Sequence, residues 1–392
     1  PTPPRGNVRR GTDFAPGTAV RAAGAPNAPA TNEPAPKTTH TAMKQLLHNL
    51  FLPLFAAVLC SGACSDDDND SRPRPSGYDI YTAGYKTPSG KSVATVWKNG
   101  SELYALTDGT NDAWAYSVFV DNGTVYAAGY EQQGDAIVGK IWVNGALKYT
   151  VAPASGSAYL YSISAADGSL YVAGSEDVNG ALTAKIWKDG AEAYAYSVSP
   201  AVSQAKAVAV SGSDVYAAGS LRSGLGKQLA VVWKNDKAHF TLSDGQTDAG
   251  ATALCFDGRT LYTAGYAGTQ AVVWKDGSVL YTLTDGNSSA QATAVCRSGS
   301  ALYAAGYVID GFENEGVVWK NGRELYDLSD GSGEGSMPYA IAVYGDDVFS
   351  AGTLFGTSRT AAVWHGEKIL HTLTDGTGHG EVYSMFVVPL YD

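Results

Sequence analysis

Seven tryptophans recur along the chain at a nearly constant interval. Successive members lie 45, 45, 46, 41, 45 and 45 residues apart. A fixed period of this length indicates a repeat architecture, in which each copy supplies one supersecondary unit. A second column keeps step with the first, because each copy also carries an Ala-Gly pair with an aromatic residue two positions before the alanine. The tryptophans are Trp97, Trp142, Trp187, Trp233, Trp274, Trp319 and Trp364, and the glycines are Gly84, Gly129, Gly174, Gly219, Gly265, Gly306 and Gly352.

Within one copy, short runs rich in Val, Tyr, Ile and Trp alternate with Gly, Asn and Asp, which is typical of strands and turns. None of these runs has the 3.6-residue apolar period of a helix. Asn-Gly and Asp-Gly pairs recur at two places per copy and are expected to close two-residue hairpins. Each copy is therefore predicted to form four antiparallel strands, here called a, b, c and d. The pairs are Asn122-Gly123, Asp167-Gly168 and Asp257-Gly258 after strand a, and Asn99-Gly100, Asn144-Gly145, Asp189-Gly190, Asp276-Gly277 and Asn321-Gly322 after strand c.

Four-stranded units of roughly 40–45 residues that repeat radially are propeller blades. The sequence therefore predicts an all-β, seven-bladed β-propeller over residues 78–392. The repeats begin with a b strand (79–85) and end with an unpaired a strand (382–388). The C-terminal a strand is expected to join the N-terminal b, c and d strands in one blade, which would close the ring and remove exposed edges. The Trp and strand-b aromatic columns then pack between blades, and the Ala-Gly column allows close backbone approach.

Three segments precede the repeats. Residues 1–42 are rich in Pro, Ala, Thr and Gly, and are expected to be disordered or to lie upstream of a start at Met43. Residues 43–64 combine a short basic start, an apolar stretch and small residues before a cysteine, which is typical of a secretory signal. Residues 65–77 contain an acidic run that is expected to form a solvated tether.

Gly62 and Ala63 directly before Cys64 resemble the lipobox of bacterial lipoproteins, although Ser61 stands where that family usually has Leu. Cys60 is the alternative lipidation site. The acidic run after Cys64 is similar to the tag of surface-exposed lipoproteins of the Bacteroides group. This resemblance implies an exported protein that is lipid-anchored in the bacterial outer membrane and faces outward, with the anchor as its only membrane contact.

Charge and cysteine content restrict the partners. Removal of residues 1–64 takes away six basic and two acidic residues and changes the net charge from −11 to −15. Nucleic acids and anionic membrane surfaces require a basic patch and are therefore not expected to bind.

Cys255 and Cys296 occupy equivalent positions in adjacent copies, too far apart for the roughly 3.5–4.5 Å Cβ separation of a disulfide, so two buried thiols are expected. We predict no metal, no cofactor and a monomer.

The b–c and d–a loops share one face of a propeller and vary strongly in length here, which makes that face the candidate functional face. Strand a lines the central channel and begins at this face. One strand-a column and its neighbour differ between copies and combine aromatic with hydrogen-bonding side chains, a set suited to a neutral glycan or similar polar ligand. Predicted ligand-binding residues are Trp114, Tyr116, Tyr161, Lys206, Thr252, Thr293, Tyr339, Glu381 and Tyr383. The neighbouring column also holds Tyr159, Gln204, Gly250, Gln291 and Met337.

Residues 117–130 and 253–266 resemble the bacterial β-propeller repeat, which reads roughly Val-Asp-x-x-Gly-Asn-Val-Tyr-Val-x-Gly-Tyr. The resemblance spans all seven copies and implies an extracytoplasmic propeller, but it transfers no catalytic residue. No Ser-His-Asp group, paired catalytic carboxylates or phosphate-binding loop can be assigned to one site. We expect a non-catalytic binding module for a glycan or peptide. The alternatives are a structural or protein-interaction scaffold of the cell envelope and, third, a polysaccharide lyase or glycosidase.

Overall fold

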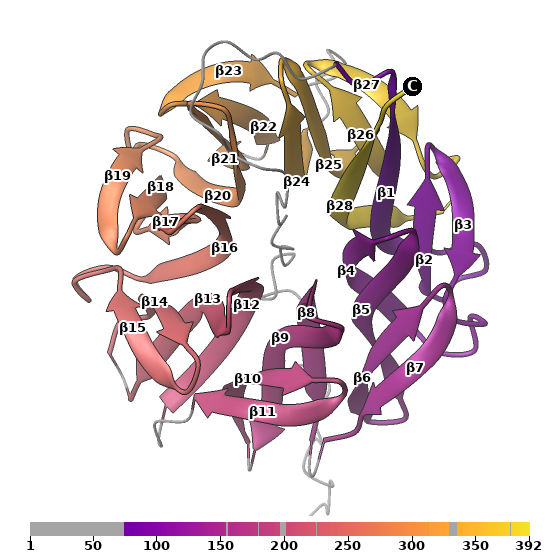
Figure 1. Ribbon diagram of the computed structural model, residues 1–392, viewed down its shortest axis with the longest axis horizontal. Coiled ribbons are helices and arrows are strands. Elements are labelled where there is room, and N and C mark those ends of the chain that lie inside the picture. Colours follow the sequence, from indigo (N-terminus) through magenta and orange to yellow (C-terminus); the bar gives the residue numbers. More distant parts are fainter. Residues whose placement is uncertain are drawn as a thin grey trace, which may run out of the picture. The chain divides into compact units, whose positions relative to one another are not determined.

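The computed structural model of the chain describes residues 74–392 except 154–155, 179, 197–200, 225, 312, 329–334 and 377. Regular structure in these residues consists of 28 β-strands, which form seven four-stranded antiparallel sheets. Figure 1 shows the sheets as blades around a ring. The predicted seven-bladed propeller is confirmed. Predictions for segments 1–42 and 43–64, for most of 65–77 and for Cys60 and Cys64 lie outside the described residues.

Each blade runs outward from strand a to strand d. We number the blades 1 (β28, β1, β2, β3), 2 (β4–β7), 3 (β8–β11), 4 (β12–β15), 5 (β16–β19), 6 (β20–β23) and 7 (β24–β27). The a strands are β28 (Gly380–Leu390), β4 (Ala113–Asp121), β8 (Ala158–Ala166), β12 (Ala201–Ser211), β16 (Ala249–Asp257), β20 (Ser289–Ser298) and β24 (Ser336–Tyr344). The b strands are β1 (Gly77–Lys86), β5 (Thr124–Gln133), β9 (Ser169–Val178), β13 (Asp214–Ser223), β17 (Thr260–Ala267), β21 (Ala301–Asp310) and β25 (Asp347–Phe355).

The outer strands are shorter on average. The c strands, which carry the tryptophan column, are β2 (Val93–Lys98), β6 (Ala136–Val143), β10 (Ala181–Lys188), β14 (Leu229–Lys234), β18 (Gln270–Lys275), β22 (Glu313–Lys320) and β26 (Arg359–His365). The d strands are β3 (Ser101–Ala105), β7 (Ala146–Val151), β11 (Ala191–Tyr196), β15 (Lys237–Thr241), β19 (Ser278–Thr282), β23 (Arg323–Asp327) and β27 (Lys368–Thr372). Residues 74–392, where described, contain no helix long and apolar enough to cross a membrane.

The ring closes as predicted, by pairing the two ends of the repeat array. Strand β28 lies antiparallel to β1, with a register that runs from Gly77 opposite Leu390 to Lys86 opposite Gly380. Figure 1 shows the C-terminal strand, in yellow, beside the first strand, in indigo. One blade is thus made of one C-terminal and three N-terminal strands, so the closure joins segments about 300 residues apart in the sequence.

The scaffold columns behave as predicted. All seven column tryptophans are buried, with at most 4 % of their surface exposed. Asn122 and Gly123 both have positive φ (47° and 76°), as a two-residue hairpin turn requires. The turn predicted at Asp257-Gly258 is wrong by one residue, because β16 extends through Asp257 and the turn is Gly258-Arg259. Cys255 and Cys296 are buried thiols, as expected.

Candidate functional site

The predicted ligand-binding column of strand a coincides with a β-bulge in every blade. In blade 2 the register between β4 and β5 shifts between Ala115 and Ser117, so Tyr116 is the extra residue. The same shift occurs once in each of the other six sheets, at the equivalent position. A bulge interrupts the ladder and re-aims one side chain, which is why bulges are common beside functional sites. The seven bulge residues are Tyr116, Tyr161, Lys206, Thr252, Thr293, Tyr339 and Tyr383.

Four of the bulge residues are tyrosines in adjacent blades, and they pack together. The rings of Tyr116 and Tyr383 are stacked with centroids 4.5 Å apart and planes 7° apart. Tyr339 lies 5.8 Å from Tyr383, and Tyr161 lies 6.1 Å from Tyr116, so the contacts run through blades 7, 1, 2 and 3. With Tyr85, Tyr130 and Tyr307 of strand b they form one buried group, which we call the tyrosine cluster.

The tyrosine cluster is enclosed, which corrects one expectation. The predicted ligand contact requires accessible side chains, but Tyr339 is fully buried, and Tyr161 and Tyr383 are only 1 % and 4 % exposed. Burial raises the pKa of Tyr116, Tyr161, Tyr339 and Tyr383 well above 10, so these phenols stay neutral at physiological pH. They are therefore suited to packing and hydrogen bonding rather than to acid–base or nucleophilic chemistry.

Two strand-b hydroxyls of the cluster are bonded to side chains of strand a. Tyr130 donates to the hydroxyl of Tyr116 over 2.8 Å, and Tyr85 donates to Glu381 Oε1 over 3.0 Å. Glu381, itself 3 % exposed, also accepts from the Arg359 guanidinium at 2.5 Å. The cation that pairs with the Glu381 carboxylate is therefore Arg359, which comes from strand c and is not one of the predicted site residues.

The other three bulge residues, Lys206, Thr252 and Thr293, make polar contacts instead of ring contacts. The ammonium of Lys206 lies 4.2 Å from the centre of the Tyr161 ring, a cation–π contact that extends the cluster into blade 4. Enclosure lowers the pKa of Lys206 well below its ordinary value. Thr252 Oγ1 lies 2.7 Å from the carbonyl oxygen of Ala292, and Thr293 Oγ1 lies 2.8 Å from that of Pro338. Both threonines are buried and link their blade to the backbone of the next one.

The neighbouring column stays partly accessible. Trp114, Tyr159, Gln204 and Gln291 are half-buried, whereas Met337 and Glu381 are buried. Trp114 contacts the rings of Tyr85 (6.4 Å) and Tyr130 (5.4 Å) and so covers the tyrosine cluster. Tyr159 contacts Tyr130 at 5.3 Å from the adjacent blade. Trp114 and Tyr159 are therefore the aromatic rings of the two strand-a columns that stay partly accessible to a ligand.

Sequence reasoning missed the strand-b partners of the site. Tyr85, Tyr130 and Tyr307 occupy the position directly after the Ala-Gly pair, opposite Glu381, Trp114 and Gln291 respectively. Tyr307 donates to Gln291 Oε1 over 3.0 Å. Their signal is present in the sequence, because this position also varies between copies while the glycine before it does not. Its other occupants are Ser175, Ser220, Tyr266 and Thr353.

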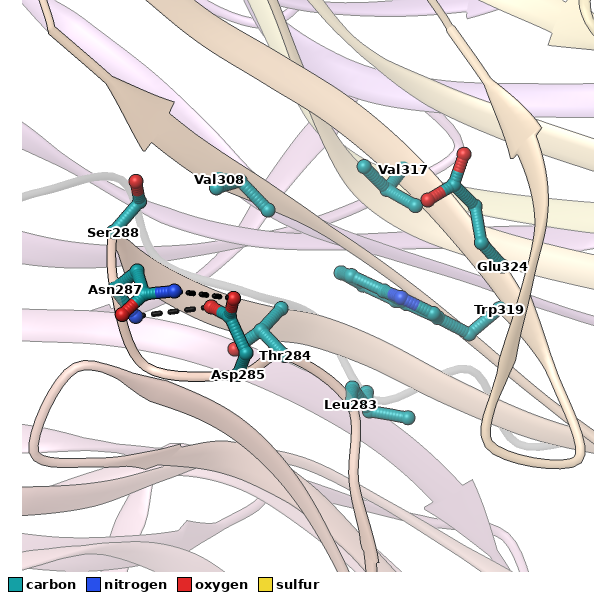
Figure 2. Close-up of a pocket in the computed structure, with 9 residues that line it drawn as sticks. All are labelled: Leu283, Thr284, Asp285, Asn287, Ser288, Val308, Val317, Trp319 and Glu324. Atoms are coloured by element: carbon teal, nitrogen blue, oxygen red, sulfur yellow. Dashed lines mark hydrogen bonds between the residues drawn. The ribbon is translucent and has the colours of Figure 1, made fainter.

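A groove between blades 5 and 6 is a second concave feature. It has a volume of about 290 Å³ and is formed by the d–a loop of blade 5 and the b, c and d strands of blade 6. Figure 2 shows the face of Trp319 turned into it, with Val308 and Val317 above the ring and Asp285, Asn287 and Ser288 across from it. Sequence reasoning did not identify this groove. Asp310, Glu313 and Glu315 lie nearby in the same blade, but among the described residues no group of three or more side chains that could hold a metal ion is present.

The similarity of this chain to known proteins is a similarity of fold. No protein-family model and no curated protein matches the chain. Similar solved structures include the WD40 β-propeller domain of Doa1 (17% identity, 71% of this chain, 91% of that chain, TM-score 0.42). Another is the β-propeller domain of the Trilobed protease from Pyrococcus furiosus (12% identity, 78% and 98%, TM-score 0.45). A third is prolyl oligopeptidase B from Galerina marginata (12% identity, 75% and 51%, TM-score 0.45). At these identities the likeness concerns the propeller architecture alone.

Proposed function

We propose that this propeller is a non-catalytic binding module whose ligand, a glycan or a peptide, binds at the b–c/d–a face. The observation that carries the proposal is the pair of half-exposed rings, Trp114 and Tyr159, which lie over an enclosed tyrosine cluster. A rigid aromatic base holds these rings in place, so little conformational entropy is lost when a ligand stacks on them. The half-buried amides of Gln204 and Gln291 supply polar groups in the same column.

Neutral phenols and amides beside aromatic faces suit a sugar or a polar peptide better than an anionic polymer. Binding sites of this kind combine apolar stacking surfaces with a few polar groups that fix orientation. The net negative charge of the chain also disfavours nucleic acids and anionic polysaccharides. We therefore place the ligand contact at Trp114 and Tyr159, with Lys206 and Arg359 as the nearest cations of the cluster.

A scaffold role for the cell envelope is the second candidate. It is favoured by the burial of Tyr161, Tyr339 and Tyr383 and by the bonding of the Thr252 and Thr293 hydroxyls to neighbouring blades. In that case the tyrosine cluster fills the end of the ring, and any partner binds the loops or the outer strands.

Substitution of Trp114 separates the two candidates. Screening of the full chain on a glycan array, together with a pull-down from envelope extract, would first supply a ligand. Loss of a stacked ring is expected to cost on the order of 2 kcal/mol, or about thirtyfold in affinity. Trp114→Ala and Tyr159→Ala should therefore weaken binding by about that factor in calorimetry.

The exposed Tyr391→Ala is the matched control and should bind normally. Trp274→Ala should instead lower the melting temperature, because that indole is buried scaffold. An unchanged dissociation constant in both Trp114→Ala and Tyr159→Ala would move the ligand away from this column. Absence of any ligand in both screens would favour the scaffold.

Export and lipid anchoring at Cys64 complete the proposal, and they rest on the sequence of residues 43–70. A metabolic lipid label is expected on the full-length protein and should disappear in Cys64→Ala, while Cys60→Ala should keep it. Protease treatment of intact cells should cleave the anchored protein if it faces outward. Full labelling of Cys64→Ala would assign the lipid to Cys60 or remove the anchor from the proposal.

A further inference from the structure

The groove between blades 5 and 6 combines an apolar wall with an acidic rim. Leu283, Val308, Val317 and the ring of Trp319 form the wall (Figure 2). Thr284, Asp285, Asn287, Ser288 and Glu324 form the rim, and none of the nine lining residues is basic. We call this feature the Glu324 groove.

Two other blades carry a lysine that pairs with the glutamate equivalent to Glu324. Glutamate stands opposite the column tryptophan on three d strands, as Glu102, Glu192 and Glu324. In blade 1, Glu102 pairs with the ammonium of Lys86. In blade 3, Glu192 pairs with the ammonium of Lys185 at 2.6 Å. In two of the three blades a lysine of the same blade therefore forms an ion pair with this glutamate.

Blade 6 has the glutamate without the lysine. Val308 stands at the position of Lys86, and Val317 stands at the position of Lys185, two residues before the tryptophan. Both valines line the groove, so the missing side-chain volume appears as the cavity. Within the described residues, Glu324 has no hydrogen bond or ion pair, and its side chain is exposed.

Electrostatics at this end of blade 6 favour a cation. Burial raises the pKa of the Glu315 carboxyl, and the neighbouring carboxylates of Asp310, Asp327, Glu313 and Glu324 raise it further. Such a pattern reports a negative field, which a bound positive charge would relieve. Across the groove, Asp285 adds another carboxylate, which accepts from the backbone N–H of Asn287 at 2.9 Å.

We propose that the Glu324 groove binds a primary ammonium on a short apolar stem, inserted from outside as Lys185 is inserted from within blade 3. The stem would lie along Val308, Val317 and the ring of Trp319, with the ammonium at Glu324. A lysine side chain of a partner and a small free amine share this chemistry. The site is separate from the tyrosine cluster and does not depend on its ligand.

The test uses the full chain labelled with 15N at the tryptophan indoles, which gives eight side-chain signals. Trp319→Phe assigns the signal of interest. Titration with n-butylamine and with N-acetyl-lysine methylamide should shift the Trp319 signal with a dissociation constant on the order of 1 mM, while n-butanol should not. Response to both amines supports a lysine side chain as the occupant, and response to n-butylamine alone supports a small free amine.

Two substitutions decide the proposal. Glu324→Gln is exposed and should fold normally, and it should weaken amine binding at least about fivefold. Val317→Lys should fill the groove from within, pair with Glu324 and abolish the response. Its matched control is Val272→Lys in blade 5, where Val279 replaces the glutamate, so that variant should melt at a lower temperature than Val317→Lys. A Trp319 signal that ignores both amines, responds equally to n-butanol, or keeps its affinity in Glu324→Gln would overturn the proposal.

Discussion

Deletion of residues 380–392 is expected to abolish cooperative folding. The deletion removes strand β28, the innermost strand of blade 1, and with it the buried side chains of Val382, Tyr383, Met385 and Val387. It also exposes the whole paired edge of β1 inside the ring. A strand edge left without its partner loses several backbone hydrogen bonds, and its free N–H and C=O groups can pair with another chain and cause aggregation. Circular dichroism during heating should show no cooperative transition.

A second reason for this severity is that β28 is bonded to blade 2 as well as to β1. Ser384 Oγ accepts from the backbone N–H of Val118 over 3.0 Å, so blade 2 loses contacts as well as β1. Removal of residues 1–74 is the control and should leave the melting curve unchanged. A C-terminally truncated chain that melts like the intact protein would show that closure by β28 contributes little to stability.

The blade count, strand order and closure could be predicted from the sequence because scaffold positions repeat. Trp142 and its six equivalents meet the same packing requirement in each blade, so the same residue recurs. Hairpin turns such as Asn122-Gly123 were predictable for a related reason, since positive φ at two successive positions restricts the choice of residue. Asp257 was assigned to the wrong position because in its copy the Asp-Gly pair stands one residue earlier, while the turn keeps its place and is formed by Gly258 and Arg259.

The candidate site was only half predictable. Aligning the copies brought Tyr116, Tyr161, Tyr339 and Tyr383 into one column, and the structure places these four in contact. Their burial was not predictable, because strand alternation says nothing about a bulge, and the bulge turns these side chains into the cluster. Partners such as Arg359 come from another strand, and no local pattern marks them.

The Glu324 groove could not be predicted for a different reason. It arises from small residues, Val308 and Val317, at positions where other blades carry Lys86 or Lys185. A cavity is a shortage of side-chain volume between two blades, so it becomes visible only when the contacts across the interface are known. The repeat alignment contains the necessary residues, but it does not say which of them share one space.

Gly306→Ala is expected to destabilise the protein by about 3 kcal/mol or more, at the upper end of what overpacking costs. A Cβ at Gly306 would lie 2.0 Å from the carbonyl oxygen of Gln291 and 2.8 Å from Cα of Ala292. Both atoms belong to the backbone of β20 beside the bulge at Thr293, so no side-chain rotation can relieve the contact. Urea denaturation should report the loss as a lower midpoint.

The same geometry links the two features that define each repeat. The strand-a bulge brings a carbonyl toward strand b, and only glycine leaves room for it, with approaches of 1.8 to 2.0 Å in all seven blades. Gly77→Ala is the matched control, because its added methyl would meet only the side chain of Leu390 at 3.7 Å, and it should cost less than about 1 kcal/mol. Equal stability of the Gly306 and Gly77 variants would mean that strand a can shift away from strand b. In that case the constant spacing of bulge and glycine in the seven copies would not be what fixes the tyrosine cluster.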